Sequence, residues 1–147
     1  MSLPTSLTIR RLQQSDFQLG FLELLATLTE VGEVSETKYN NVLTNLPSNI
    51  HIFVIQDTEK NKIIGTATLF IETKFVYAGK VGHIEDVVVS PDYRGKNLGK
   101  TLTQHLLRVA ESLGCTKTTL DCSKHNVGFY ERCGLSRNGV QMGIYYH

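Results

Sequence analysis

The chain has 147 residues, of which 41% are hydrophobic, and a formal net charge of +1. This length favours a single domain spanning residues 1–147, able to bury about two-thirds of the surface of its unfolded chain. The near-neutral charge argues against nucleic acid as a partner, and the lack of a long apolar run argues against a membrane-spanning segment or a secretory leader.

Cysteine and histidine are too scattered to suggest a metal site. The three cysteines, Cys115, Cys122 and Cys133, are odd in number and lack the paired spacing of a zinc site. The five histidines form no ligand cluster along the sequence. We therefore expect reduced thiols, no bound metal and a soluble protein of the cytoplasm.

The first elements are short. A strand is predicted for residues 7–11. From Ser15, a candidate N-cap, apolar residues recur at helical spacing as far as Leu28, and a second helix is predicted over residues 35–46, which a proline follows. Two helices are thus expected between the first and second strands.

The middle of the chain is rich in β-branched residues. Residues 50–56, 63–73 and 81–89 are predicted as three successive antiparallel strands. A glycine-containing turn at residues 94–99 follows the third of them and begins an amphipathic helix that extends to residue 113.

The last third of the chain continues this alternation. A strand over residues 116–121 is expected to be parallel to the strand over residues 81–89, because a helix separates them. A short helix over residues 126–132 and a final strand over residues 139–146 follow. The order of elements predicts a mixed sheet.

The turn at residues 94–99 is a candidate anion site. Its backbone N–H groups and the positive end of the following helix dipole converge, and Arg94 and Lys96 add positive charge. It lacks the third glycine of a dinucleotide fingerprint and the Lys-Ser/Thr of a magnesium-nucleotide loop. The pattern R-G-x-x-L-G after a valine-rich strand resembles the acetyl-CoA pyrophosphate loop of the GNAT acetyltransferase superfamily; a plain helix-opening turn is the alternative.

In such sheets, ligands bind in the crevice at the carboxyl ends of adjacent parallel strands. Phosphates held by the turn would lay an extended pantetheine arm between the strands over residues 85–89 and 116–121. Backbone groups left unpaired there would bond its amides. A backbone N–H near Val87 would then polarise the thioester carbonyl.

Three carboxylates and a phenol near this crevice are candidate catalytic groups. Glu85 and Asp86 are adjacent on a strand, so alternation predicts that they point to opposite faces. Asp121 follows the next strand and either acts on a substrate amine or caps the turn after it. Tyr130 either protonates a departing thiolate or packs with Phe129. Together the acids would hold a cationic amine and remove its proton.

Further segments narrow the resemblance to the glucosamine-6-phosphate N-acetyltransferase family within the GNAT superfamily. They are residues 28–32, 82–87, 120–122, 126–134 and 139–142, spread over almost the whole chain. The resemblance implies transfer of acetyl from acetyl-CoA to the 2-amine of glucosamine 6-phosphate, on the route to UDP-N-acetylglucosamine. The implied attack is direct, without an acetyl-enzyme or a metal.

The resemblance also implies residue roles. Glu85 and Asp86, with Asp121, would contact the amino sugar and manage its amine, and Tyr130 would be the acid for the CoA thiolate. Glu85, Asp121 and Tyr130 are the implied catalytic residues. The implied substrate-binding residues are Thr29, Lys74, Phe75, Val76, Tyr77, Glu85, Asp86, Val87, Lys117, Asp121 and Tyr145. The implied cofactor-binding residues are Val87, Val88, Val89, Arg94, Gly95, Lys96, Asn97, Leu98, Gly99, Asn126 and Tyr130, although Asn126 alternatively caps the short helix.

The implied architecture is an α/β fold of the α+β GNAT type. It has a mixed, mostly antiparallel twisted sheet of about six or seven strands, flanked by four helices and splayed at the acetyl-CoA site. The family forms an intertwined homodimer whose active sites borrow residues across the interface. No nucleic acid or membrane partner is implied.

One position departs from the family pattern. Near the C-terminus the family carries an arginine that helps to bind the sugar phosphate, and here Tyr145 stands at that position. A tyrosine offers one hydroxyl donor in place of a charged fork. Either Arg137, Lys74 or Lys117 compensates, or the affinity for phosphate is weaker.

The N-terminal region also contains a targeting pattern. Arg11 and Leu12, followed after five residues by Gln18 and Leu19, match the N-terminal signal of peroxisome-like organelles such as glycosomes. The alternative is that these residues serve only the fold.

Two other functions remain open on the sequence. One is a GNAT activity on another small amine or a protein lysine. The other is a CoA-binding module without catalysis.

Overall fold

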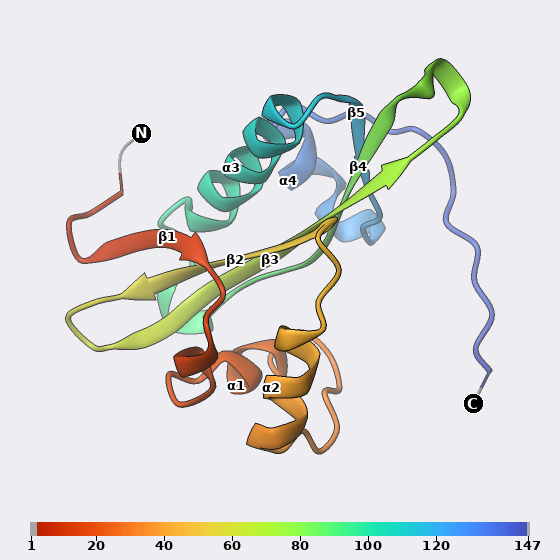
Figure 1. The fold of residues 1–147 in the computed structure, drawn as a ribbon. Helices are drawn as coiled ribbons and strands as arrows, with labels where there is room; N and C mark the ends of the chain where they lie inside the picture. Colours follow the sequence, from red (N-terminus) through yellow and green to blue (C-terminus); the bar gives the residue numbers. More distant parts are fainter. Residues whose placement is uncertain (1–2, 147) are drawn as a thin grey trace.

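A single five-stranded sheet forms the centre of the protein in the computed structural model, which describes residues 3–146 (Figure 1). The strand order is β1-β2-β3-β4-β5; neighbours up to β4 are antiparallel, and β4 and β5 are parallel. The mixed, mostly antiparallel sheet is confirmed. The strands are β1 (Leu7–Arg11), β2 (Ile50–Asp57), β3 (Lys62–Thr73), β4 (Lys80–Val89) and β5 (Cys115–Leu120).

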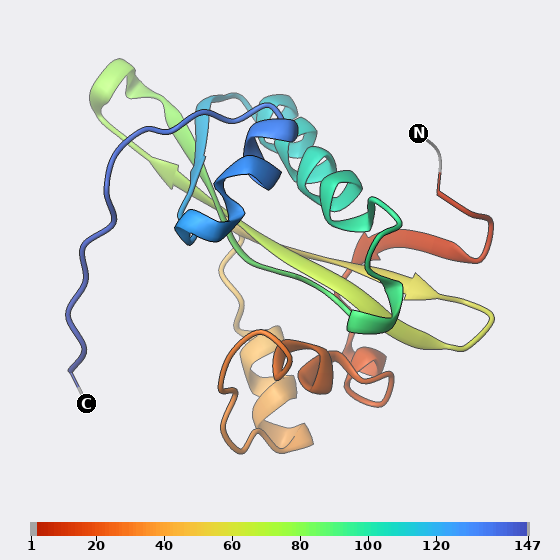
Figure 2. The same cartoon turned by 180° about the vertical axis from the view of Figure 1, so that it is seen from behind.

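Four α-helices cover the two faces of the sheet, as expected. α1 (Phe21–Leu25) and α2 (Glu36–Thr44) lie on one face, and α3 (Leu98–Ser112) and α4 (Val127–Arg132) lie on the other (Figure 2). The predicted apolar stripe of α3 is confirmed, because Leu102 and Leu106 are fully buried against the sheet.

The helix predicted from Ser15 to Leu28 is not continuous. The chain forms a 3-10 turn at Gln14–Phe17, then reaches Gly20 with a left-handed φ of 89°, and only then begins α1. Glycine adopts this conformation without the steric cost of a side chain, so it interrupts a helix that apolar spacing alone would continue.

The strand predicted over residues 139–146 is the main correction to the expected architecture. Within residues 3–146 this tail pairs with no strand, so the sheet has five strands and not six or seven. The tail runs away from the sheet to the C-terminus (Figure 1). Its alternating apolar side chains Val140, Met142 and Ile144 are 74–91% exposed. The alternation is that of a strand, but a strand needs a neighbour to bond its backbone.

The targeting pattern lies in folded structure. Leu12 and Leu19 pack against the apolar cluster under α1 and α2. Gln18 donates a hydrogen bond to Glu36, and Arg11 lies 2.8 Å from the His51 ring nitrogen. None of the helices described is long and apolar enough to cross a membrane.

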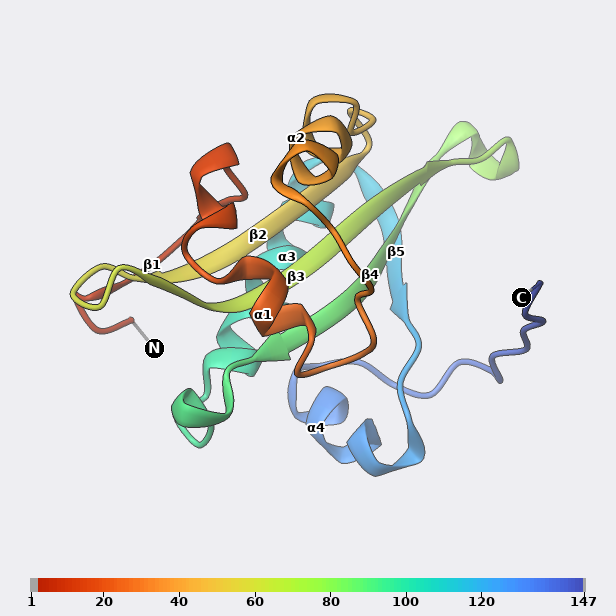
Figure 3. The ribbon, with the colours of Figure 1, turned by 90° about the horizontal axis from the view of Figure 1, so that it is seen from below.

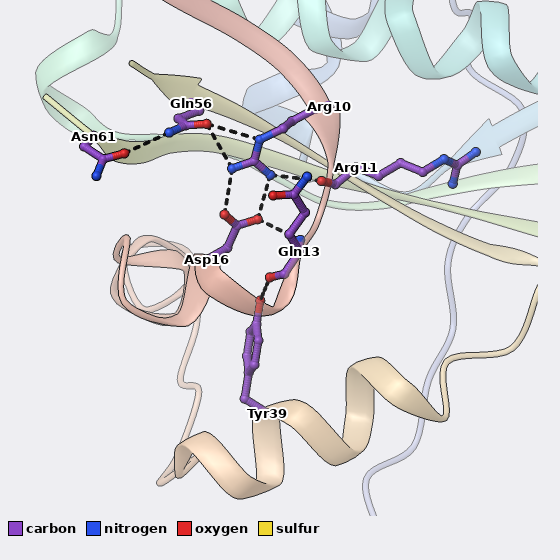
Figure 4. A network of polar contacts seen from close by, with 7 residues as sticks. All are labelled: Arg10, Arg11, Gln13, Asp16, Tyr39, Gln56 and Asn61. Carbon is purple, nitrogen blue, oxygen red and sulfur yellow. Dashed lines mark hydrogen bonds and ion pairs between the residues drawn. The ribbon is translucent and has the colours of Figure 1, made fainter. Parts of the chain in front are cut away.

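A buried ion pair joins β1 to the segment before α1 (Figure 4). Asp16 is fully buried, and its two carboxylate oxygens accept hydrogen bonds of 2.8 and 2.7 Å from the Arg10 guanidinium. Arg10 also donates to Gln56 of β2, and the Tyr39 hydroxyl of α2 donates to the Gln13 carbonyl. One network thus holds β1, β2 and α2 together.

We predict that Asp16→Ala lowers the free energy of unfolding by about 3 kcal/mol, because removing one partner leaves a largely buried guanidinium uncompensated. Urea unfolding measures this. Glu33→Ala, at an exposed site, is the control and should change stability by less than about 0.5 kcal/mol. Equal unfolding midpoints for the two variants would contradict the prediction.

Candidate functional site

β4 and β5 separate toward their own carboxyl ends (Figure 3). Their pairing runs from Lys80 and Cys115 to Ile84 and Leu120, but β4 continues to Val89. Residues 85–89 therefore have no partner strand on the β5 side within the described chain. Their unpaired backbone groups line the edge of the opening, as a splayed sheet requires.

A β-bulge lies at the start of the unpaired segment. Thr68 is opposite Glu85 and Thr66 is opposite Val88, so one residue of β3 faces two residues of β4. Asp86, one of the two, has a φ of 53°. A left-handed residue and an extra residue in one strand together define a bulge, which redirects the backbone locally.

The bulge changes the face of the sheet to which the following side chains of β4 point. Ile84 packs in the cluster beneath α3, whereas Val88, four residues on, packs in the cluster beneath α1 and α2. Val87 and Val89 contact the α3 side instead. Regular alternation is therefore broken between Ile84 and Val88, because an extra residue interrupts the period of two. The prediction that Glu85 and Asp86 point to opposite faces stays a prediction.

Two carboxylates flank the place where the strands part. Glu85 follows Ile84 and Asp121 follows Leu120, and Ile84 and Leu120 are the last register partners of the two strands. Both carboxylates belong to exposed residues, and neither forms an ion pair within residues 3–146. They are thus available to a cationic ligand in the opening.

The glycine-containing turn lies directly before α3. Gly95 and Asn97 have left-handed φ values of 81° and 59°, and Asn97 makes no side-chain cap to the helix. The exposed Arg94 and Lys96 have no carboxylate within 4.0 Å among residues 3–146. Free N–H groups at the start of a 15-residue helix, with two such cations, suit an anion.

Gly99 brings this turn close to α4. A Cβ at Gly99 would lie 3.1 Å from Cζ of Phe129. The aromatic ring therefore occupies the space that any side chain would need. This contact places α4, with Tyr130, beside the glycine-containing turn of residues 94–99, called the anion turn below.

Tyr130 is a half-buried phenol. Burial raises its pKa above the ordinary value of tyrosine, and neighbouring Cys122 and Cys133 act in the same direction. The ring of Phe129 lies edge-on to it, with centroids 5.0 Å apart. Because the pKa is raised, the phenol keeps its proton throughout the neutral range and is able to donate it. Asn126, at the start of α4, makes no side-chain cap, so its amide is free for a ligand.

A polar row on the sheet was missed at the sequence level. His83 lies 2.9 Å from the Thr119 hydroxyl on β5, and its other ring nitrogen is 3.6 Å from Glu72 on β3. Glu72 also pairs with Lys74 at 3.7 Å. These side chains lie on the face that carries Glu85, and only the strand register, which the sequence does not state, brings them together.

The residues expected at the sugar phosphate are dispersed within one chain. Phe75, Val76 and Tyr77 form the tip of the β3–β4 connection and are 65–103% exposed, about 17 Å along β4 from Glu85 by strand rise. Thr29 follows α1, Lys117 lies on β5, and Tyr145 is in the unpaired tail, 96% exposed. A single chain thus assembles the anion turn and the carboxylates but not this set.

No group of His, Cys, Asp or Glu within residues 3–146 is arranged to hold a metal ion. The three cysteines are free thiols, of which Cys133 is buried and Cys122 exposed.

The chain is similar over most of its length to known acetyltransferases. A model of the acetyltransferase (GNAT) family matches residues 9–135. The glucosamine 6-phosphate N-acetyltransferase of Candida albicans is 43% identical over 146 residues, covering 97% of each chain. That of Trypanosoma brucei brucei is 40% identical over 140 residues, covering 94% of this chain and 95% of the relative. The crystal structure of the Arabidopsis thaliana enzyme of that name superposes with a TM-score of 0.93 at 41% identity, covering 96% of this chain and 99% of the other.

The positive φ of Asp86 in the bulge leads to a prediction about substitutions at this position. Asp86→Val should lower the free energy of unfolding by about 1–2 kcal/mol, because a β-branched residue is strained at a positive φ. Asp86→Gly should cost little, since glycine adopts that conformation freely. Glu85→Val, next to the bulge, is the matched control and should lose no stability. Identical urea midpoints for the two valine variants would contradict the strain assigned to the bulge.

Proposed function

Because the chain belongs to the GNAT acetyltransferase family, we propose that it transfers the acetyl group of acetyl-CoA to the 2-amino group of glucosamine 6-phosphate. The products would be N-acetylglucosamine 6-phosphate and CoA. The observation that carries the proposal is the parting of β4 and β5 beside an anion turn, in a chain similar over almost its full length to enzymes named for this reaction.

The chain's own groups suit the phosphate and amide parts of acetyl-CoA. Arg94, Lys96 and the free N–H groups at the start of α3 would hold the pyrophosphate. The unpaired backbone of residues 87–89 would bond the amides of the pantetheine arm, with the Asn126 amide beside it. Leaving these backbone N–H and C=O groups unpaired in a closed site would cost free energy. The amides of the pantetheine arm would supply their hydrogen-bond partners.

Glu85 and Asp121 would act on the acceptor. Their carboxylates, unpaired in the chain, would attract the protonated amine and accept its proton, which leaves the neutral amine as nucleophile. The bulge would direct the Val87 region of the backbone into the opening, where its N–H would stabilise the oxyanion formed on the thioester carbonyl. Attack is direct, and no acetyl-enzyme is needed.

Tyr130 would complete the reaction as the acid. When the tetrahedral intermediate collapses, the C–S bond breaks and the CoA thiolate takes a proton from the phenol. Because the pKa of Tyr130 is raised above the ordinary value of tyrosine, the phenol is protonated at neutral pH and is able to donate this proton. The ammonium loses two protons in all: the one accepted by Glu85 or Asp121 before attack passes to solvent. The second, lost from the nitrogen of the tetrahedral intermediate, balances the proton that Tyr130 gives to sulfur.

The sugar phosphate would be held by cations and donors from dispersed segments. Lys74, Lys117 and Arg137 are the charged candidates, with Thr29, the tip at residues 75–77 and Tyr145 around them. Lys74 already lies 3.7 Å from Glu72, so part of its charge is neutralised. Tyr145 would replace the family arginine with a single hydroxyl donor, which leaves Lys117 and Arg137 as the cations of this subsite without a carboxylate within 4.0 Å in the described chain.

We also propose that two copies form a homodimer through the C-terminal tail. β5 is an edge strand, and the tail is an unpaired strand-like segment with apolar residues at every second position. Pairing the tail of one copy with the sheet of another would satisfy both and cover Val140, Met142 and Ile144. It would also bring Tyr145 of one copy to the site of the other.

The substrate prediction is tested by thiol release from acetyl-CoA. We expect turnover with glucosamine 6-phosphate and little with glucosamine or a lysine peptide, because only the first supplies both amine and phosphate. Comparable rates with the lysine peptide would favour another GNAT activity, and no turnover with any acceptor but tight CoA binding would favour a binding module.

Glu85→Gln should lower kcat by about 100-fold or more while CoA binding, measured by calorimetry, is kept.

The dimer is tested by light scattering. The full chain should show twice the 16.5 kDa of one copy. Met142→Asp should weaken the dimer and reduce activity with it, because a charge enters the apolar side of the tail. Gln141→Asp, on the other side of the tail, is the matched control and should remain dimeric. A monomeric full chain with normal activity would overturn the proposal.

A further inference from the structure

The turn between β2 and β3 lies against the anion turn through one buried tyrosine. Tyr93, immediately before Arg94, is 8% exposed, and its hydroxyl donates a 2.5 Å hydrogen bond to Asp57 at the end of β2. These residues are far apart in the sequence but meet beneath the start of α3. No role in the reaction described above involves Asp57 or the β2–β3 turn.

Asp57 orders both segments at once. One carboxylate oxygen accepts the Tyr93 hydroxyl, and the other accepts the backbone N–H groups of Glu59 and Lys60 at 3.0 and 3.1 Å. The Tyr93 hydrogen bond and the Lys60 N–H lower the pKa of Asp57, and the same hydrogen bond raises the pKa of Tyr93 to about 12. At neutral pH Asp57 is therefore an ionised carboxylate, and the Tyr93 hydroxyl is the donor of the hydrogen bond between them.

Two lysines meet at the ring of Tyr93. Nζ of Lys60 lies 5.7 Å from the ring centroid, and Nζ of Lys96 lies 5.3 Å from it. Neither ammonium has a carboxylate within 4.0 Å among residues 3–146. The charge of Lys60 contributes to lowering the pKa of Asp57, but that carboxylate is not within ion-pair distance of it. Since cation–π attraction is weak at exposed sites, both ammonium groups lack an ion-pair partner within the described chain.

A phosphate would supply that partner. Lys96 belongs to the anion turn, and Lys60 brings a further cation to it from another part of the chain. The neighbouring carboxylate, Asp92, is exposed and forms no ion pair in the part of the chain described, and Asp57 is already engaged with Tyr93. The charges nearest the turn are therefore predominantly positive.

We propose that Lys60 is a further binding residue for a phosphate group of CoA, and that Asp57 and Tyr93 are positioning residues that hold the β2–β3 turn against the anion turn. The proposal rests on acetyl-CoA as the donor in the proposed function. It extends the cofactor site to a segment outside the glycine-containing turn.

The direct test is CoA binding by titration calorimetry, which needs no turnover. Lys60→Ala should weaken CoA binding about five-fold, as expected for one exposed charge contact, and should reduce the salt dependence of the affinity. Lys62→Ala, two residues along the same connection, is the matched control and should bind CoA like the parent. Equal affinities for the Lys60 and Lys62 variants at low salt would overturn the proposal.

Dephospho-CoA, which lacks the 3′-phosphate, identifies the phosphate concerned. If Lys60→Ala weakens CoA but not dephospho-CoA, Lys60 contacts the 3′-phosphate. If it weakens both equally, Lys60 contacts the pyrophosphate. Either result supports the proposal, and an effect on neither ligand contradicts it.

The positioning pair is tested by steady-state kinetics. Tyr93→Phe keeps the ring but removes the hydroxyl, so the KM for acetyl-CoA should rise about three-fold with kcat and the KM for the amino sugar nearly unchanged. Asp57→Asn keeps an oxygen that accepts the hydroxyl and should resemble the parent more than Asp57→Ala does. Equal changes in both KM values would assign the pair to stability alone. Failure of the parent to acetylate glucosamine 6-phosphate would overturn the proposed acceptor but leave the CoA titrations interpretable.

Discussion

The parting of β4 from β5 is the constraint on which the rest of the site depends. Backbone N–H and C=O groups in a sheet must find partners, and residues 85–89 of β4 lose theirs on one side after the Ile84–Leu120 pair. In the proposed function, a ligand with its own donors and acceptors enters the opening and would offset this cost. The turn at residues 94–99 and α4 lie beside the opening, so the unpaired strand edge and the charged turn would bind the same molecule.

The bulge at Asp86 links this opening to both cores. By inserting one residue it moves Val88 to the face of α1 and α2 while Val87 and Val89 stay with α3. The same few residues therefore pack against both helical layers and present the backbone that the proposed cofactor would bond. A site built on a central strand packed on both faces is more rigid than one on a loop, which favours accurate placement of an oxyanion donor.

Sequence patterns predicted what is local. The stripe of α3, the strand meander and the anion turn are contiguous, and each follows from spacing or from residue type. The break at Gly20, the bulge at Asp86 and the missing partner of the tail were not predicted, because each depends on a neighbour elsewhere in the chain or in another copy. The pairs His83–Thr119 and Asp57–Tyr93 likewise follow from strand register and packing, which periodicity does not determine.

The two halves of the bisubstrate site are encoded differently, and this difference bears on specificity. The donor half is compact: most of its cations and N–H groups lie in residues 94–99, with Lys60 proposed as an addition. The acceptor half is dispersed over the loop after α1, the β3–β4 tip, β5 and the tail, and several of these segments are largely exposed in one copy. If two copies complete this half as proposed, single substitutions, such as one at Tyr145, would change recognition of the acceptor without disturbing how the donor binds. In the proposed function, binding of the donor phosphates is therefore concentrated in one segment, and recognition of the acceptor is left to several others.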